Sequence, residues 1–562
     1  MQIDSRTVMP GAVIETDICI IGAGPAGITL AREFIGTSLH VLVLESGGFE
    51  NDTHIQELSN GKVNSQYMRD IALTAGRHRQ FGGTPNIWAY RTEPWDGRSY
   101  ARSVPPEARD FDTHSDDPSL CWPVSFDQLR PHYENAQTVW NGGTFDYRID
   151  TWGSGLRQLG TANGVLETRI SQHGPSDVFT VYYRDELLAA ENIDLGLGCT
   201  AIALEPNGAA DRASTVRVAR GDGHHFSVAA KSYVLACGGV ENVQLLLSSD
   251  MAQPGAVGNR HDNIGRYVTD HPEFVIGFMS PGDQDAYKNI GLYDIRWVDG
   301  QMVSGFLTLS EEVKRSENLL NMSVAFSPRG QGFGTEAHRA IVDLAVIRQR
   351  EVPMRPFADM LSILRSPLEA FAFLRTFSSQ NYAEYRGGWS HPAVDSSKFR
   401  ALELWGAFEQ TPHRENRLSL IEDRDWLGRR KLRFDHLWSK IDRQNIQRSI
   451  EIFTAEINAA GIGHLRPWYD LERSFRPQFH GLHHPMGGTR MHVDPQFGVV
   501  DENCRVHGLV NVYVAGSSVF PTGIGYSNPT LTLLALTSRL ADHLKGQLGV
   551  GQRLGGHQFH AG

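Results

Sequence analysis

Thr16–Gly27 reads TDICIIGAGPAG and decides the fold of this chain. The β-branched apolar run stops abruptly at Gly22, and apolar residues then recur at helical spacing over Pro25–Phe34. A second apolar run, Leu39–Leu44, stops at Glu45. The pattern predicts a strand, a tight glycine turn, a helix and a second parallel strand, which together make a βαβ unit buried on both faces.

The glycines of this turn have the GxGxxG spacing of a dinucleotide-binding loop. Gly22 permits the tight turn, Gly24 lets the backbone approach a pyrophosphate, and Gly27 lets helix and strand pack closely. The phosphates would sit at the helix N-terminus, where unpaired N–H groups point outward. Glu45 ends the second strand, where a carboxylate can accept from the ribose hydroxyls and disfavours the 2′-phosphate of NADP. An ordinary glycine turn is the alternative.

Two later segments repeat the strand–glycine–helix pattern. Tyr233–Gly239 leads into a helical stretch, and Val510–Gly516 also ends in glycine. Just before the first of these segments, residues 195–234 alternate in short strands separated by glycine-containing turns, which predicts hairpins. Segments so far apart imply one nucleotide-binding domain assembled from discontinuous pieces, with the intervening chain forming a second domain.

Composition excludes several classes of protein. The 562 residues carry 53 Lys and Arg against 64 Asp and Glu, a net charge of −11, which argues against a nucleic-acid partner. No apolar run approaches the roughly 18 residues of a membrane span. The N-terminus lacks the apolar region of a secretory signal, and the five cysteines are scattered. We therefore expect a cytoplasmic protein without disulfides.

An apolar stripe marks the segment 340–377. Its members recur at spacings of four and three residues: Phe357, Leu361, Leu364, Leu368 and Phe371. The favoured interpretation is a helical insert docked on the core by this stripe. A lid over the active site and a surface for an electron-accepting partner are the alternatives. Residues 546–562 are rich in glycine and are expected to form a flexible tail.

Polar side chains flank the last strand–glycine segment. His483-His484 precedes a glycine-rich turn, and Asn528-Pro529 opens an apolar helical run. Asn528 can be a helix N-cap with Pro529 as the first helical residue. The histidines can be ordinary polar residues or metal ligands, although no third ligand stands at a zinc-like spacing.

These motifs resemble the glucose–methanol–choline (GMC) family of flavin oxidoreductases. The resemblance rests on Gly22–Gly27 with Glu45, Gly82-Gly83-Thr84, 235–247, Asn263–Arg266 with His271-Pro272, 409–420 and 484–544. Within the family the chain looks most similar to the branch of pyranose oxidase, related glycoside oxidases and bacterial sugar and polyol dehydrogenases.

The resemblance implies an α/β plus α+β fold, with a Rossmann-like FAD-binding domain and a mixed-sheet substrate-binding domain. The FAD-binding domain is expected to comprise residues 1–100, 190–275 and 485–545. The substrate-binding domain is expected to comprise 101–189 and 276–484, including the insert.

The resemblance also assigns the site. His484 matches the base that takes the hydroxyl proton of an alcohol while a hydride passes to flavin N5, and Asn528 matches its partner, which holds the same oxygen. His483 is the weaker candidate. The helix after Pro529 would stabilise the reduced flavin with its positive end. The implied cofactor-binding residues are Gly22, Gly24, Ala26, Gly27, Glu45, Ser46, Gly83, Thr84, Asn86, Ile87, Cys237, Gly238, Gly516, Ser517, Asn528, Pro529 and Thr530.

Two positions depart from pyranose oxidase. Ile87 stands where some relatives carry the histidine that bonds FAD covalently, so FAD is expected to be non-covalent. Ala89 stands where pyranose oxidase has a hydroxyl residue near flavin N5, which favours a dehydrogenase over an oxidase.

The predicted function is FAD-dependent oxidation of a secondary alcohol of a sugar or glycoside to a ketone, with no metal. One alternative is a GMC enzyme that tailors an aminocyclitol, terpenoid or polyketide natural product. Another is a flavin-binding protein without catalysis. A third, which only the insert 340–377 suggests, is a membrane-associated subunit that delivers electrons to a quinone or a cytochrome. The electron acceptor and the oligomeric state stay open.

Overall fold

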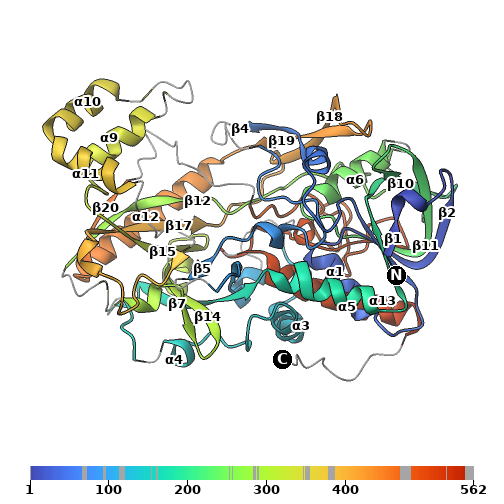
Figure 1. The fold of residues 1–562 in the computed structure, drawn as a ribbon, viewed down its shortest axis with the longest axis horizontal. Coiled ribbons are helices and arrows are strands. Elements are labelled where there is room, and N and C mark those ends of the chain that lie inside the picture. The colour runs from blue at the N-terminus through green and yellow to red at the C-terminus, as the bar shows by residue number, and fades with distance from the viewer. Residues whose placement is uncertain are drawn as a thin grey trace.

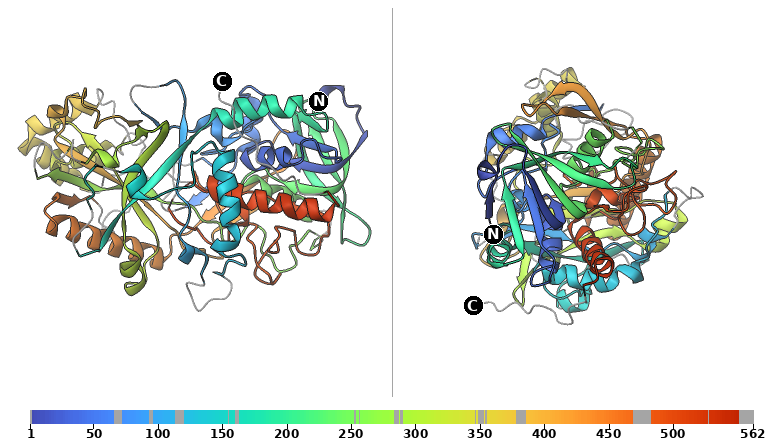
Figure 2. Two further views of the ribbon diagram at one scale, coloured as in Figure 1. Left: turned by 90° about the horizontal axis from the view of Figure 1, so that it is seen from below. Right: turned by 90° about the vertical axis from the view of Figure 1, so that its right-hand side faces the viewer.

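Two large β-sheets with helices around them organise the chain. The computed structural model describes residues 2–550 apart from 66–71, 93–95, 113–119, 154, 160–162, 252–253, 256, 283–286, 288–289, 346, 348–352, 354, 378–385, 469–482 and 527. The expected flexible tail therefore lies mostly outside the described residues. The two sheets lie toward opposite ends of an elongated molecule, as Figure 1 and the left panel of Figure 2 show.

The first sheet has the strand order β1-β8-β3-β2-β11-β10-β9, with β21 beside β11. Its parallel part contains β1, β8, β3, β2, β11 and β21, whereas β9 and β10 continue it as antiparallel hairpins. The strand bounds are β1 (Gln2–Asp4), β2 (Val13–Ile21), β3 (Val41–Glu45), β8 (Ile193–Leu197), β9 (Cys199–Pro206), β10 (Ala213–Arg220), β11 (His225–Leu235) and β21 (Val512–Val514). The predicted βαβ unit is confirmed, with α1 (Pro25–Glu33) joining β2 to β3.

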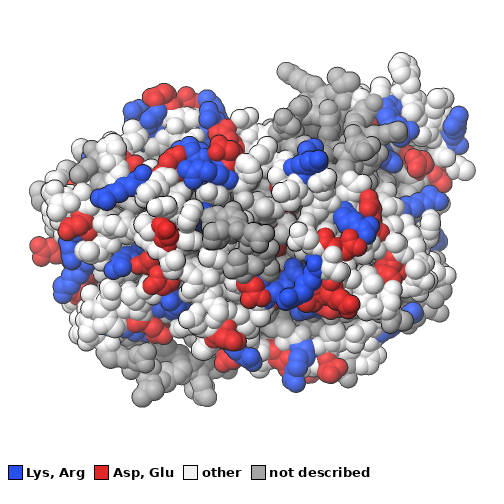
Figure 3. Space-filling view, turned by 180° about the vertical axis from the view of Figure 1, so that it is seen from behind, with Lys and Arg blue, Asp and Glu red and all other residues white. Residues whose placement is uncertain are grey.

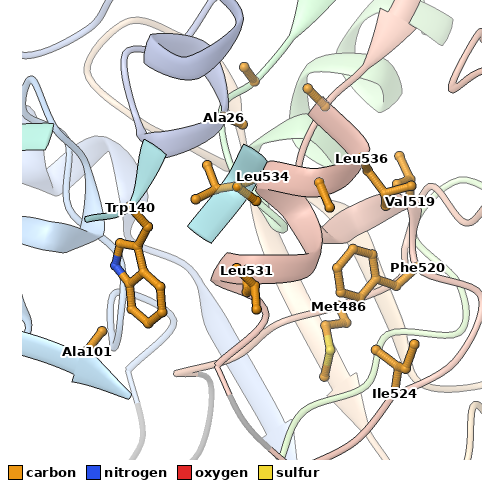
Figure 4. Close-up of a cluster of buried hydrophobic side chains, with 14 of the residues drawn as sticks. Ala26, Ala101, Trp140, Met486, Val519, Phe520, Ile524, Leu531, Leu534 and Leu536 are labelled. Carbon is orange, nitrogen blue, oxygen red and sulfur yellow. The ribbon is translucent and has the colours of Figure 1, made fainter. Parts of the chain in front are cut away.

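Apolar side chains explain why this sheet is buried on both faces. Every residue of Val41–Glu45 is buried, and so are the last four residues of β2. The long helix α13 (Thr530–Gln547) packs against α1 and α3 (Phe126–Val139). Figure 4 shows Leu531 and Leu534 of α13 within the buried apolar cluster that surrounds its first turns. The core thus holds the first turn of α13 in a fixed position.

The second sheet has the order β20-β12-β17-β15-β14-β7-β6, with β13 beside β14, and its described pairs are antiparallel. Its strands are β6 (Tyr100–Ser103), β7 (Leu166–Pro175), β12 (Glu273–Pro281), β13 (Arg296–Val298), β14 (Gln301–Leu309), β15 (Met322–Arg329), β17 (Ala401–Phe408) and β20 (Gly463–Pro467). Helix α12 (Lys440–Ala459) packs beside β20. The predicted fold class, α/β plus α+β, is confirmed.

Smaller elements complete the fold. Two further sheets pair β18 (Arg417–Arg424), β19 (Arg430–His436) and β4 (Lys62–Ser65), and β16 (Arg386–Gly387) with β5 (Arg91–Thr92). The remaining α-helices are α2 (Thr53–Gln56), α4 (Ile149–Trp152), α5 (Tyr183–Ala189), α6 (Glu241–Asp250), α8 (Glu311–Ser316), α9 (Glu336–Ala345), α10 (Pro356–Arg365) and α11 (Pro367–Phe377).

The insert 340–377 differs from its favoured interpretation. It is helical, as predicted, and its helices α10 and α11 begin at Pro356 and Pro367. All five stripe residues, Phe357, Leu361, Leu364, Leu368 and Phe371, are exposed, so the expectation that the stripe docks on the core is wrong. The opposite faces of the two helices pack on α9 instead.

The surface and the cysteines agree with the composition. Acidic and basic side chains are interspersed over the face seen in Figure 3, without a stripe of one sign. Among the described residues, no helix is long and apolar enough to cross a membrane. All five cysteines are free thiols.

Candidate active site

A cavity of about 340 Å³ opens where the parallel strands of the first sheet end. It is lined by residues that follow β2, β3, β11 and β21 directly, and it reaches Tyr100 and Glu273 of the second sheet. Ligands of open α/β sheets bind at the carboxyl ends of the strands, and this volume lies in the usual range for ligand pockets. The cavity is therefore the candidate site.

Most of the residues assigned from the sequence meet in this cavity. Those that line it are Gly22, Gly24, Ala26, Glu45, Ser46, Gly83, Thr84, Ile87, Cys237, Gly238, Gly516, Ser517, Asn528, Pro529 and Thr530, together with His483 and His484. Gly27 and Asn86 do not line it. Both support the turns that do.

Gly27 provides the close approach of α1 to β2. A Cβ atom at this position would lie 1.9 Å from the carbonyl oxygen of Gly22, so no larger residue fits without moving the backbone. Gly22 has φ of 110°, and a Cβ there would lie 2.5 Å from the carbonyl oxygen of Ala236. By contrast, a Cβ on Gly24 would meet nothing within 4 Å. Backbone packing thus closes one side of the loop and leaves the cavity side open.

Asn86 holds the second glycine turn in place. Its side-chain amide donates to the carbonyl oxygens of Phe81 and Gly83, at 3.0 and 2.9 Å. The backbone N–H of Gly82 donates in turn to Ala23 in the first loop. The two glycine turns therefore form one continuous wall of backbone.

Glu45 is buried, and its carboxylate lies against the first loop. It accepts from the backbone N–H of Ala23 at 2.9 Å and from that of Gly47 at 2.8 Å. These bonds hold the acid at the end of β3, where it lines the cavity beside Ser46.

A cluster of buried arginine side chains lines the cavity near Glu45 and Ser46. This cluster was not predicted from the sequence. Arg77 and Arg79 come from the segment before the second glycine turn, and Arg429 comes from the turn between β18 and β19. Arg77 pairs with Glu241, while Arg79 donates to Ser46 and Ser59. The Nη2 atom of Arg79 is buried without a hydrogen-bond partner, 3.5 Å from Glu241 Oε1. The cluster offers a positive, unsatisfied donor to an anionic ligand.

The charged side chains of this cluster shift the pKa values of their neighbours. Although burial acts to raise the pKa of Glu241, Arg77 and Arg79 hold that pKa below its usual range. Burial, followed by the neighbouring Arg79, lowers the pKa of Arg429 to about 10, so this side chain still carries its charge at neutral pH. Arg77 and Arg79, close before Gly82, are the part of the cluster that is visible in the local sequence. Glu241 and Arg429 lie far away in the sequence, so their contacts with these arginines could not be predicted from it.

Two helices, α1 and α13, begin at the cavity, and no side chain caps either N-terminus. Gly24 precedes α1, and Pro529 is the N-cap residue of α13. The suggestion that Asn528 caps α13 with Pro529 inside the helix is therefore wrong by one residue. Asn528 lines the cavity, and the positive ends of both helices are available there to a ligand.

His484 is half-buried and belongs to a hydrogen-bonded chain with the buried His271 and the carbonyl of Gly523. His271 Nε2 lies 2.7 Å from the carbonyl oxygen of Gly523, and His271 Nδ1 lies 3.4 Å from His484 Nδ1. A carbonyl only accepts, so a neutral His271 carries its proton on Nε2 and accepts on Nδ1. His484 then donates from Nδ1 and keeps a lone pair on Nε2. Asp270 accepts from the backbone N–H groups of both histidines, each at 2.9 Å.

The surroundings favour a neutral imidazole at this position. Burial holds the pKa of His484 well below its usual range, and His271, His483 and Arg102 act in the same direction. A neutral imidazole with a lone pair on Nε2 can accept a proton from a bound hydroxyl.

Three further side chains line the wall next to the second glycine turn. Ile87 is aliphatic, and Ala89 has no hydroxyl. Trp88 packs edge-on against Trp140.

Cys237, which follows β11, also lines the cavity. Its thiol donates to the carbonyl oxygen of Ile21, and burial raises the pKa of the thiol to about 12, so it stays protonated and unreactive.

A glycine loop between β2 and α1, with a cavity at the carboxyl ends of parallel strands, is the arrangement of a dinucleotide-binding domain. The described residues hold no group of three or more ligands for a metal ion. Models of the two parts of the GMC oxidoreductases match residues 160–273 and 412–537. The chain belongs to the GMC oxidoreductase family and is therefore an FAD-dependent oxidoreductase.

Two relatives show the breadth of the similarity. The fructose dehydrogenase large subunit of Gluconobacter japonicus is 22% identical over 97% of this chain and 100% of its own length. The 6'''-hydroxyparomomycin C oxidase of Streptomyces lividus is 24% identical over 54% of this chain and 64% of its own.

Solved structures share the fold. The chain is similar to pyridoxine 4-oxidase from Mesorbium loti, with a TM-score of 0.53 and 16% identity over 94% of this chain and 99% of that one. It is also similar to an FAD-dependent oxidoreductase from Chaetomium thermophilum, with a TM-score of 0.54 and 14% identity over 95% and 100%.

The cavity fits FAD in three physical respects. The unsatisfied Arg79 donor and the two uncapped helix ends suit a pyrophosphate, and the open side of Gly24 leaves space for it. Glu45 ends β3 where the acid of such loops meets a ribose. Ile87 has no atom that could form a covalent bond to the flavin.

Replacing Arg79 with Leu should weaken FAD binding by about 10-fold to 100-fold, because a charged hydrogen bond contributes about 1.5–3 kcal/mol. The measurement is titration of the apoprotein with FAD. Preparing that apoprotein under mild conditions also tests that no covalent bond holds the flavin. Arg130→Leu, on the exposed face of α3, is the matched control and should leave the affinity unchanged. Equal affinity in both variants would contradict the role of Arg79.

Replacing His271 with Phe should slow flavin reduction by the substrate at least 10-fold, because Nδ1 of His484 loses the acceptor that sets its tautomer. His271→Asn places an amide oxygen near the position of Nδ1 and should restore most of the rate. Stopped-flow reduction of the holoenzymes measures both. Asn and Phe variants with the same rate, at unchanged FAD content, would show that His271 only fills space.

Proposed function

We propose that this protein oxidises a secondary alcohol, a ring hydroxyl of a sugar or glycoside, to a ketone. The observation that carries the proposal is His484, which lines the same cavity as Asn528 while His271 lies within hydrogen-bond distance of its Nδ1. A protein that used FAD only as a structural element would have no need for a base at this place. The fructose dehydrogenase relative supports the same class of substrate.

The proposed chemistry divides two tasks between the side chains and the cofactor. FAD, when bound, supplies the acceptor for the hydride from the carbinol carbon. His484 Nε2 takes the hydroxyl proton, and Asn528 donates to the same oxygen and fixes its position. The uncapped N-terminus of α13 presents unpaired N–H groups where negative charge develops.

A side recess supports a polyhydroxylated substrate. This recess of about 30 Å³ shares Tyr90 and Glu273 with the main cavity. Trp389 and Trp405 supply aromatic surface, and the hydroxyl of Ser323 is buried there without a hydrogen-bond partner. Aromatic faces combined with unsatisfied polar groups suit a ring that carries several hydroxyls.

One observation favours an aminocyclitol as a second candidate substrate. Glu273 is a buried carboxyl at the junction of cavity and recess, and burial raises its pKa. An ammonium group of a substrate would compensate the charge of this carboxylate. The hydroxyparomomycin oxidase relative agrees with that candidate.

Replacing His484 with Ala should slow substrate-dependent bleaching of the flavin band by a factor of about 10² to 10⁴, the usual contribution of a general base. FAD should stay bound, because the proposed contacts of His484 are to the substrate. His483→Ala is the matched control and should retain the rate within a few-fold. Anaerobic stopped-flow absorbance measures both variants.

The pH dependence gives a second readout for His484. A base must be deprotonated to act, and the pKa of His484 is lowered, so kcat/KM should stay level down to below about pH 6.5 and fall only at lower pH. Unchanged bleaching in His484→Ala, or an acid limb well above pH 6.5 for the unaltered enzyme, would place the base elsewhere.

The proposed electron acceptor is a compound other than dioxygen, because Ala89 places no hydroxyl at the wall beside Trp88. Reduced holoenzyme mixed with air-saturated buffer should reoxidise slowly, on a scale of seconds or longer, and an artificial quinone should reoxidise it faster. Stopped-flow absorbance follows both reactions. Reoxidation by air faster than catalytic turnover would identify an oxidase.

A further inference from the structure

The most exposed apolar surface of the described chain lies on α10 and α11. Seven large side chains of these helices form what we call the apolar tip: Phe357, Met360, Leu361, Leu364, Leu368, Phe371 and Leu374. Phe357 and Leu368 are each 83% exposed, and Leu364 is 73% exposed. On α10 the four members stand at spacings of three, four and seven residues from the first, so they share one face of the helix.

The opposite faces of the two helices are already satisfied. Phe373 and Ala370 are buried on the side of α9, where the Phe373 ring lies 4.0 Å from that of His338. Asp359 is buried beneath α10, and its pKa is raised to about 6 by burial and by a hydrogen bond with Asp343. The inward sides of both helices are therefore already packed, yet their outward sides still carry seven large apolar side chains. An ordinary surface helix exposes its polar side instead.

The position of the tip argues against a lid. The three helices form a projection at the end of the molecule remote from the first sheet, in Figure 1 and in the left panel of Figure 2. Among the described residues, none from α9, α10 or α11 lines the candidate active site. Because the tip belongs to a projection away from the cavity, it is suited to contacting a partner surface and not to enclosing a ligand.

The size and the charges of this surface point to one kind of partner. Its exposed area is roughly 700 Å², if each fully exposed side chain offers about 150 Å², and monomeric proteins rarely expose more than a few hundred in one patch. The exposed charges within 355–377 are Arg355, Arg365 and Arg375 against Glu369 alone. Arginines beside an apolar helix face are typical of helices that lie in the interface of an anionic membrane.

We propose that the apolar tip docks this enzyme on an anionic lipid bilayer, with α10 and α11 lying in the interface. Helices of 10 and 11 residues are too short to cross a bilayer, so the protein lies on its surface. A two-fold dimer through the same face would bring the three arginines of each copy toward those of the other, which opposes pairing. The phosphates of an anionic bilayer attract these side chains instead.

Flotation of the holoenzyme with vesicles tests the docking. The protein should float with phosphatidylcholine vesicles that contain about a third phosphatidylglycerol, and binding to pure phosphatidylcholine should be at least 10-fold weaker. Replacing Phe357, Leu368 and Phe371 together with Ser should lower binding to the anionic vesicles at least 10-fold. The matched control replaces three exposed apolar residues elsewhere, Met9, Ile441 and Val510, with Ser and should bind like the unaltered protein.

Separate variants test the role of the three arginines, and light scattering tests a dimer as the alternative occupant of the tip. Replacing Arg355, Arg365 and Arg375 with Gln should abolish the preference for anionic vesicles. No flotation, or equal flotation of the Phe357/Leu368/Phe371 variant, would overturn the proposal. Light scattering that shows a dimer, separated into monomers by that variant, would assign the tip to a second copy instead. The melting temperature and FAD content of each variant show whether weaker binding comes from loss of docking or from misfolding. The rate of flavin reduction by a soluble substrate, measured in parallel, tests the proposed function independently of membrane binding.

Discussion

Contact of backbone with backbone at one edge of the parallel sheet is the constraint on which the rest of this structure depends. Gly27 packs on Gly22, and Gly22 packs on Ala236, at distances where a side chain has no room. This packing brings the ends of β2 and β11 together and leaves Gly24 facing open space. The cavity, the uncapped end of α1 and the place of Glu45 all follow from that arrangement.

The second requirement is that α13 begins at the same edge. Its apolar residues are buried in the core, so its first turn cannot move away from the cavity. Asn528 precedes that turn, and the chain of Gly523, His271 and His484 approaches from the other side. Helix end, amide and imidazole thereby converge on one volume, although they come from segments that are distant in sequence.

The parts predicted correctly from sequence were those with a local signal. The Thr16–Gly27 pattern predicted the βαβ unit because apolar periodicity and glycine spacing act over a few residues. The arginine cluster and the contact of His271 with His484 could not be predicted, because each joins residues from remote segments. The insert failed for another reason: an apolar stripe at helical spacing indicates a helix and a partner for it, but the pattern cannot specify that α9 packs on the opposite face and leaves the stripe exposed.

We propose that the cavity converts an alcohol to a ketone, with loss of a proton and a hydride from the substrate. Anaerobic mixing of the holoenzyme with monosaccharides, glycosides, aminocyclitols and aliphatic alcohols, followed by flavin absorbance, tests it most directly. A compound with a secondary ring hydroxyl should bleach the flavin, and the rate should be slower when the carbinol carbon carries deuterium. A flavin that stays oxidised with every alcohol, or a rate that is insensitive to deuterium because another bond breaks, would contradict it.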